Sequence, residues 1–469
     1  MSKPSSRGYR RYHIGSSPAP DIVSWPPRFR VKVGRLGLAR LLLREAIQYK
    51  GDTEVILSRP CVYGVFSGRL AGFKPIEGRC VGCLRCTTQY PEFVQVHHNP
   101  ERQRLGDSYF TSRHVDAVVY EAATGNIPVK GAGYRGQFGG EGWDGMWTDM
   151  SEIVRPTRDG IHGREFISTV VDIGVRPNFL VFDDRGRPAG DTPHTFSLPL
   201  PVLLDVPPAA VASPTLYQIL ERTAAAVDSL AILPLAVIRE HRFHGPHVVP
   251  LLSAADAAEA DSLPSGVRLV EMDGWDESLY RAIRGRLPEV LVCLRLPFGD
   301  GNTLRRYREV GIHVFHLTAD YHGHNPDRAF VFDLIRTAHN TFVADGTRDE
   351  VTLLGSGGLI AAEHVPKAII AGLDAVILDT PLLVALQARF SGEFNHPDSP
   401  GCRLPRQLTV SWGQQRLQNL IAAWRDQLLE VLGAMGLREV RRLRGEMGRA
   451  MFQEDLEREA FAGIEGFGE

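Results

Sequence analysis

The sequence predicts an α/β protein whose main part is a (β/α)8 barrel of the TIM type. Eight short apolar runs alternate with amphipathic segments between residues 196 and 400, which predicts the barrel; a compact group of cysteines precedes it, and a helical extension follows it. Helical crossovers call for a parallel sheet, and eight such units fit a closed barrel. An open, doubly wound sheet is the alternative, although the first βα unit lacks the Gly-x-Gly-x-x-Gly turn of dinucleotide-binding folds.

The apolar runs have the length and the turn-bounded pattern of buried strands. In a barrel of parallel strands, the functional site lies at the carboxyl ends of the strands. The expected strands are residues 202–206, 230–237, 248–252, 267–272, 290–296, 313–317, 351–354 and 375–378.

Composition excludes several classes of protein. With 53 Lys and Arg against 55 Asp and Glu, the net charge of −2 argues against a chain that binds nucleic acid along its whole length. A hydrophobic content of 43% excludes a disordered chain, and six cysteines in 469 residues are too few for a disulfide scaffold. The first residues contain no apolar segment typical of a signal peptide, so we expect a cytoplasmic protein without a membrane span.

Five parts follow one another along the chain. They are a basic arm with a short helix (1–50), the cysteine segment (51–100), a glycine-rich lead-in (101–195), the barrel (196–400) and the C-terminal helical extension (401–469). Residues 1–35 hold eight basic residues and one acid. This pattern suggests a strap across a partner subunit, with a disordered tail as the alternative.

The cysteine segment contains the motif Cys80-x-x-Cys83-x-x-Cys86. Thiolates at this spacing bind one face of an iron–sulfur cube, as in bacterial ferredoxins. The fourth cysteine of the ferredoxin motif is missing, because Tyr90-Pro91 stands in its place, and Cys61 is the nearest candidate for a fourth ligand. We therefore predict one [4Fe–4S] cluster on these four cysteines. Zinc would accept the same ligands, and a segment without metal is the third possibility.

Glycine-rich turns follow the last two expected strands. Ser356-Gly357-Gly358 comes after the seventh strand, and Asp379-Thr380 comes after the eighth. Backbone N–H groups of such turns can hold one phosphate, and glycine lets the backbone approach it closely. An ordinary tight turn is the alternative interpretation.

These turns, together with Ser411-Trp-Gly-Gln-Gln-Arg-Leu-Gln-Asn419 and the stretch 432–445, resemble the FMN-binding barrel of glutamate synthase. The stretch 146–165 resembles the lead-in of glutamate synthase-like proteins that carry a ferredoxin-type N-terminus. The resemblance covers roughly residues 54–460 and is strongest from 350 onward. It implies FMN, with its phosphate held by Ser356, Gly357, Gly358, Asp379 and Thr380.

The resemblance also implies roles for three further side chains. Arg295 takes the place of the family's lysine near the flavin, where its charge would stabilise the reduced anion; a structural ion pair is the alternative. Asp320 and His322 follow the sixth strand, where they could donate or accept a substrate proton; a solvated loop is the alternative. His316 is expected to be buried in the barrel. A second group, His241, His244 and His247, is expected on a loop at the barrel mouth.

Together these features predict a flavin and iron–sulfur oxidoreductase, or an electron-transfer subunit, of glutamate synthase type. Other redox subunits are the expected partners, and no nucleic acid or membrane is expected. One alternative is a true glutamate synthase core that aminates 2-oxoglutarate with ammonia from a partner. The other is a non-catalytic scaffold subunit with a degenerate flavin site.

Overall fold

The computed structural model describes residues 12–58, 61–68, 71–127, 139–148, 167–175, 182–187 and 194–464. Two compact units make up the chain, and we call them the barrel unit and the cysteine unit. The barrel unit comprises Met1–Pro20, Asp116–Pro128 and Gln137–Glu469, and the cysteine unit comprises Asp21–Val115 and Val129–Gly136.

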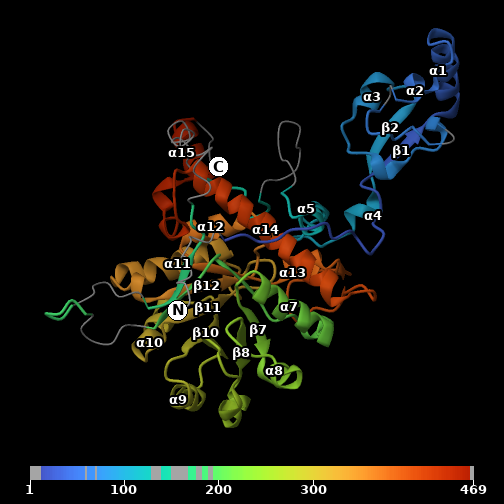
Figure 1. Ribbon diagram of the computed structural model, residues 1–469. Helices are drawn as coiled ribbons and strands as arrows, with labels where there is room; N and C mark the ends of the chain where they lie inside the picture. Colours follow the sequence, from blue (N-terminus) through green and yellow to red (C-terminus); the bar gives the residue numbers. More distant parts are fainter. Residues whose placement is uncertain are drawn as a thin grey trace, which may run out of the picture. The chain divides into compact units, whose positions relative to one another are not determined.

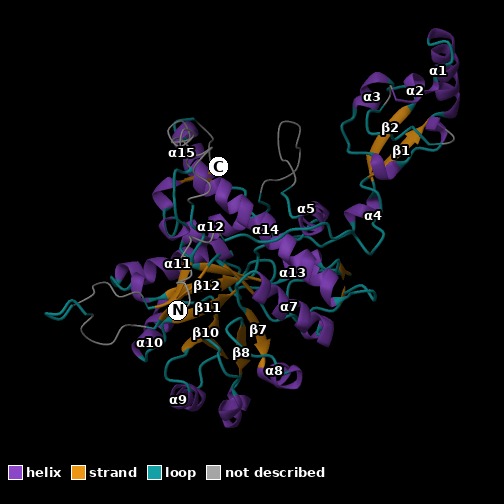
Figure 2. Ribbon diagram, viewed as in Figure 1, coloured by secondary structure: helices purple, strands orange, loops and turns teal. Residues whose placement is uncertain are grey.

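Eight parallel strands form a closed barrel with helices around it (Figures 1 and 2). All eight expected strands are present, with ends that differ by at most three residues from the prediction, and the closed barrel excludes the open sheet. The strands are β6 (Val202–Leu204), β7 (Ala231–Pro234), β8 (Val248–Leu252), β9 (Leu269–Asp273), β10 (Leu291–Pro297), β11 (Val314–Thr318), β12 (Thr352–Ser356) and β13 (Ala375–Leu378).

Helices connect these strands, and polar side chains fix where several of them begin. Ser213, Asp276 and Asp300 each accept a hydrogen bond from the backbone N–H three residues further on, as N-caps do. The connecting helices are α7 (Pro214–Ala226), α8 (Leu235–His241), α9 (Glu277–Arg286), α10 (Gly301–Glu309), α11 (Val331–Ala344), α12 (His364–Ala371) and α13 (Thr380–Ala385), with a 3₁₀ helix (Ala254–Ser262) after β8.

The glycine-rich lead-in holds regular structure that the sequence did not indicate. Helix α5 (Ser112–Thr124) lies in it, and β4 (Val171–Gly174) pairs with β5 (Thr195–Leu198). Strand β3 (Met146–Thr148) pairs with β16 (Ala450–Phe452) near the C-terminus. Residues 149–165 of the stretch that resembles glutamate synthase-like lead-ins lie outside the described residues.

The C-terminal region contains the 25-residue helix α14 (Val410–Ala434) and the shorter α15 (Gln453–Phe461). Short 3₁₀ helices (Val440–Arg442 and Met447–Arg449) separate them, and a two-stranded sheet of β14 (Arg389–Phe390) and β15 (Cys402–Arg403) precedes α14.

The described part of the expected basic arm does not extend from the molecule as a free strap. Within the barrel unit, Asn419 of α14 donates to the carbonyl of Ser17 at 2.8 Å, and Arg416 donates to the carbonyl of Ala19 at 2.9 Å. Tyr12 donates to the carbonyl of Val227 at 2.6 Å. Residues 12–20 therefore pack against their own chain, and their role as a partner strap stays a prediction. Residues 1–11 lie outside the described part.

The cysteine unit is built on an antiparallel pair of strands, β1 (Phe29–Val33) and β2 (Val94–His98). Strand β1 lies inside the region expected to be an arm, whereas α1 (Arg35–Gln48) matches the expected short helix. The remaining elements are α2 (Thr53–Ser58), α3 (Arg85–Gln89), α4 (Pro100–Gln103) and two 3₁₀ turns (Ala71–Phe73 and Glu77–Arg79). Among the described residues, no helix combines the length and the hydropathy needed to cross a membrane.

Candidate cofactor sites

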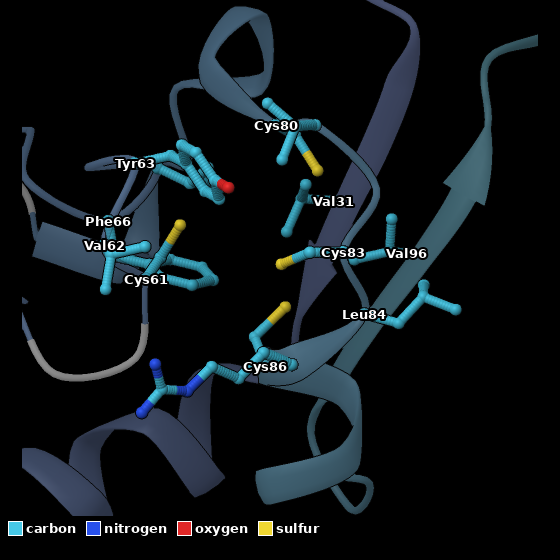
Figure 3. Close-up of a pocket in the computed structure, with 13 residues that line it drawn as sticks. Val31, Cys61, Val62, Tyr63, Phe66, Cys80, Cys83, Leu84, Cys86 and Val96 are labelled. Atoms are coloured by element: carbon cyan, nitrogen blue, oxygen red, sulfur yellow. The ribbon is translucent and has the colours of Figure 1, made fainter. Parts of the chain in front are cut away.

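Cys61, Cys80, Cys83 and Cys86 line one pocket of the cysteine unit. Figure 3 shows their sulfur atoms pointing toward a common space between the loop that carries Cys61 and the loop that leads into α3. Three of the thiols are at least partly buried, and Cys83 is exposed. The sequence prediction grouped these four residues, and the structure brings all four together. Metal binding itself stays a prediction.

Two left-handed residues shape the loop between the first and third cysteine of the motif. Gly82 has φ +73°, and a Cβ at this position would overlap the ring of Phe29. Leu84 has φ 59°, an uncommon conformation for a branched side chain. Apolar packing against Val31, Phe66 and Val94 surrounds the buried thiols. The fold thus holds the cysteines on a strained loop over an apolar core.

Burial raises the pKa of the Cys80 and Cys86 thiols, and the neighbouring cysteines raise each pKa further. Backbone N–H groups of Gly82 and Thr87 oppose this effect, because they donate to the sulfurs of Cys80 and Cys86. A bound metal centre would favour the thiolate form of these groups, so its binding would release protons.

Zinc and an iron–sulfur cluster require different spacings of the four sulfurs. Four thiolates around one zinc ion at about 2.3 Å would lie about 3.8 Å from one another. In the described part of the chain, these cysteines provide no set of three sulfurs that all lie within 4.8 Å of one another. Wider spacing suits a cluster, because each thiolate then binds a different iron atom.

In the barrel unit, Arg295 at the carboxyl end of β10 lies among acidic groups. Its guanidinium makes a two-pronged ion pair with Asp205, at 2.9 and 3.0 Å, and a further contact of 3.2 Å with Glu271. Burial raises the pKa of Asp205, but Arg295 and His316 outweigh it, and the net shift is downward. The ion pair, which was the alternative interpretation of Arg295, is therefore present.

His316 is fully buried, as expected, and connects two other buried groups. Its Nδ1 lies 2.9 Å from Glu271 Oε1, and its Nε2 lies 2.9 Å from Ser356 Oγ. Both contacts are satisfied if Nδ1–H donates to Oε1 and the serine hydroxyl donates to Nε2, whereas Glu271 Oε2 has no hydrogen-bond partner among the described residues. The sequence analysis missed Asp205 and Glu271, since neither belongs to a motif. It assigned Ser356 to a phosphate, whereas the hydroxyl contacts His316.

Asp379 is a buried carboxyl at the start of α13, 8% exposed. It accepts the backbone N–H of Gly357 at Oδ2, at 3.1 Å, and the N–H of Thr380 at Oδ1. Burial, and then the charge of Asp205, raise the pKa of Asp379 to about 7, although these N–H donors lower it. A signal for this role was present in the sequence, since an Asp shortly before a proline is typical of a helix N-cap.

The turn after β12 also contacts other parts of the barrel unit. A Cβ on Gly357 would lie 2.5 Å from the carbonyl oxygen of Ala319, so the neighbouring turn already requires glycine there. The carbonyl of Gly358 accepts the indole N–H of Trp143 at 3.1 Å, and the Trp143 ring stacks on His364 with centroids 4.6 Å apart. The lead-in residue Trp143 thus covers this turn.

The proposed proton-handling residues lie on the turn after β11. Asp320 Oδ1 accepts the backbone N–H groups of His322, at 3.0 Å, and His324, at 2.8 Å, so it organises its own loop. His322 Nε2 lies 3.9 Å from Glu393 Oε2. A catalytic role for Asp320 or His322 stays a prediction. The loop 241–247, which carries the second group of histidines, comes directly before β8, and His247 contacts the carbonyl of Ser229 just before β7. This loop therefore lies at the amino ends of the strands, and the expectation that it lies at the barrel mouth is wrong.

The proteins to which this sequence is similar are described as glutamate synthases. Residues 332–438 match the family model described as the conserved region in glutamate synthase. An archaeal-type glutamate synthase [NADPH] of Dehalococcoides mccartyi is 21% identical over 432 residues, which cover 78% of this chain and 85% of that protein. An archaeal glutamate synthase [NADPH] of Archaeoglobus fulgidus is 36% identical over 135 residues, 27% of this chain and 26% of that one.

Solved structures with a similar fold include a mandelate oxidase variant with benzaldehyde and a flavocytochrome b2 variant with sulfite bound. The first is 14% identical with a TM-score of 0.36, and covers 64% of this chain and 98% of its own. The second is 11% identical with a TM-score of 0.40, and covers 65% of this chain and 80% of its own.

Fold and site together define a (β/α)8-barrel protein joined to a separate four-cysteine unit. Within that class, the chain is similar to glutamate synthases, and its residues 332–438 match the conserved region of that family.

Proposed function

We propose that this chain is a glutamate synthase-like oxidoreductase or electron-transfer subunit, with one [4Fe–4S] cluster in the cysteine unit and a flavin at the mouth of the barrel. The observation that carries the proposal is the convergence of four cysteine sulfurs in one pocket of a chain whose barrel is glutamate synthase-like. A cluster supplies single electrons, and a flavin exchanges them for pairs.

Cys61, Cys80, Cys83 and Cys86 are the residues that would hold the cluster. Their shared pocket, their partial burial and the N–H donors to two of the sulfurs all support this assignment. Hydrogen bonds to the sulfurs and an apolar surrounding are the means by which a protein sets the potential of such a centre.

A redox partner would approach the cluster through its exposed edge. Cys83 is exposed, and two large apolar side chains that line the same pocket, Val62 and Val81, are 70% and 49% exposed. Exposed apolar side chains at a functional site are typical of a protein interface. This face therefore supports the proposal that electrons enter or leave through another subunit, such as one that oxidises the NADPH named for the relatives.

The residues assigned to the flavin phosphate fit it only in part. Thr380 offers a buried hydroxyl, 2% exposed, that has no hydrogen-bond partner among the described residues. The N–H groups of Gly357 and Thr380, however, already donate to Asp379. This observation favours the scaffold subunit with a degenerate flavin site as a second candidate function, and we derive no reaction step through the flavin.

The test begins with anaerobic purification of the full chain, followed by a visible spectrum and measurement of iron, sulfide, zinc and flavin. About four iron and four sulfide per chain are expected. Zinc without sulfide would refute the cluster. Cys83→Ser should lower the iron content, whereas the matched change Cys293→Ser should not, because Cys293 lies buried in β10. A protein that contains iron and sulfide but no flavin would support the scaffold subunit with a degenerate flavin site. Binding of 2-oxoglutarate would indicate a glutamate synthase core.

A further inference from the structure

Backbone N–H groups from two neighbouring βα turns of the barrel donate to the same carboxylate, which is a side chain of this protein. The N–H of Gly357 comes from the turn after β12, and the N–H of Thr380 comes from the first residue of α13. Both donate to the carboxylate of Asp379. Donors from the turns after the seventh and eighth strands are the groups that receive a phosphate in many barrel enzymes.

The surroundings of Asp379 disfavour a second anion. Asp205, 5% exposed, stands at the carboxyl end of β6, the neighbour of β13 in the barrel. Asp205 and Asp379 line the same cavity, whose other walls are apolar side chains of α7, α13 and the segment 206–208. A phosphate placed here would meet the buried carboxyl of Asp379 and that of Asp205, whose charge is partly offset by its ion pair with Arg295, in an environment that screens charge poorly. Its usual backbone donors would also be engaged.

The hydroxyl of Thr380 is a third donor at the same place. It is buried and makes no hydrogen bond of normal geometry in the described part of the chain, although it lies near enough to the Asp379 carboxyl to lower its pKa. A buried hydroxyl without a well-formed hydrogen bond costs free energy, so this position suits a hydrogen-bond acceptor. The turns therefore retain the form of an anion site, and Asp379 supplies the anion.

We propose that Asp379 is a specificity-determining residue of the barrel: its carboxylate occupies the backbone donors that would receive a flavin phosphate, so that the mouth does not select FMN over riboflavin. This inference rests on the proposed function, which places a flavin at the barrel mouth. It goes beyond that function because it assigns Asp379 to exclusion of the phosphate rather than to its binding.

The experiment measures the dissociation constants of FMN and riboflavin for the full chain at pH 8, by quenching of flavin fluorescence. The wild type should bind the two flavins equally. Asp379→Gly removes the internal anion and frees both N–H groups, so FMN should bind about tenfold more tightly or better, while riboflavin binding stays unchanged. Asp327→Asn, at an exposed position, is the control and should change neither constant.

A second variant guards against misfolding. Asp379→Asn keeps the size of the side chain and removes its charge, so it should raise FMN affinity less than Asp379→Gly does, because an amide oxygen still engages one donor. Unchanged or weaker FMN binding in both variants would overturn the inference, since Asp379 would then not exclude the phosphate.

Inorganic phosphate separates this inference from the flavin assignment. Binding of phosphate to Asp379→Gly but not to the wild type, measured by calorimetry, would support the inference even if neither protein bound a flavin; the flavin proposal alone would then fail. If Asp379→Gly bound neither phosphate nor FMN, the freed donors would not form a phosphate site, and the inference would be wrong. Riboflavin binding to the wild type supports the flavin proposal independently.

Discussion

The replacement Asp379→Asn should make the stability of the barrel less dependent on pH. Burial and Asp205 raise the pKa of Asp379 to about 7, whereas the carboxyl of an unfolded chain titrates near its ordinary pKa of 3.8. The folded protein therefore holds a proton that the unfolded chain has already lost. Stability falls as the pH rises from about 4 to about 7, and the loss is complete above 7.

The size of this effect follows from the pKa difference. A shift of about three units, at about 1.36 kcal/mol per unit, amounts to a loss of about 4 kcal/mol over the whole range. Between pH 5 and pH 8, the part attributable to Asp379 is about 2–3 kcal/mol. Asparagine carries no charge at either pH, so the variant lacks this part. Any constant cost of placing an amide NH2 group near the backbone donors cancels when the two pH values are compared.

Urea unfolding of both proteins at pH 5 and pH 8 measures the effect, followed by tryptophan fluorescence. Trp143 and Trp424 are buried in the barrel unit and report on its unfolding. The wild type should lose more stability than Asp379→Asn between the two pH values, and the exposed control Asp327→Asn should behave like the wild type. If the wild type and Asp379→Asn lost equal stability, the carboxyl would not be held protonated, and the reasoning from burial and Asp205 would be refuted.

Two further predictions concern the cysteine loop and the buried ion pair. Gly82→Ala should lower the iron content and destabilise the cysteine unit by about 1 kcal/mol or more, because alanine at φ +73° is strained and its Cβ overlaps Phe29. An iron assay and a thermal melt measure the two effects. The control Gly78→Ala places its Cβ in open space and should change neither the iron content nor the stability. Arg295→Met should destabilise the barrel by about 3–5 kcal/mol in urea unfolding, because it leaves Asp205 and Glu271 buried without their cation. The matched change Arg305→Met, at a more exposed ion pair with Asp345, should cost about 1 kcal/mol or less, and equal losses would contradict the argument.

Local sequence pattern was sufficient for the barrel strands and for the group of cysteines. Strands buried on both faces read as continuous apolar runs, and helices with polar N-caps separate them, so their positions follow from neighbouring residues alone. The spacing of Cys80, Cys83 and Cys86 likewise reflects a loop of seven residues. Strand β1 and helix α5 were missed although neither is interrupted, because β1 is only five residues long and holds two basic residues, and α5 lies in the region taken as glycine-rich loops.

What the sequence determined by itself is the (β/α)8 class, the cysteine group and the resemblance to glutamate synthase. The tertiary structure decided what the polar residues at the barrel mouth contact. Arg295 meets Asp205 across 90 residues of chain, and Gly357 meets Asp379 across 22. Residues 12–20 lie against α14, about 400 residues away. Such contacts form only when the barrel closes and brings distant residues together. Whether a buried charge then has a partner depends on residues far away in the sequence, so no local pattern of residues predicts it.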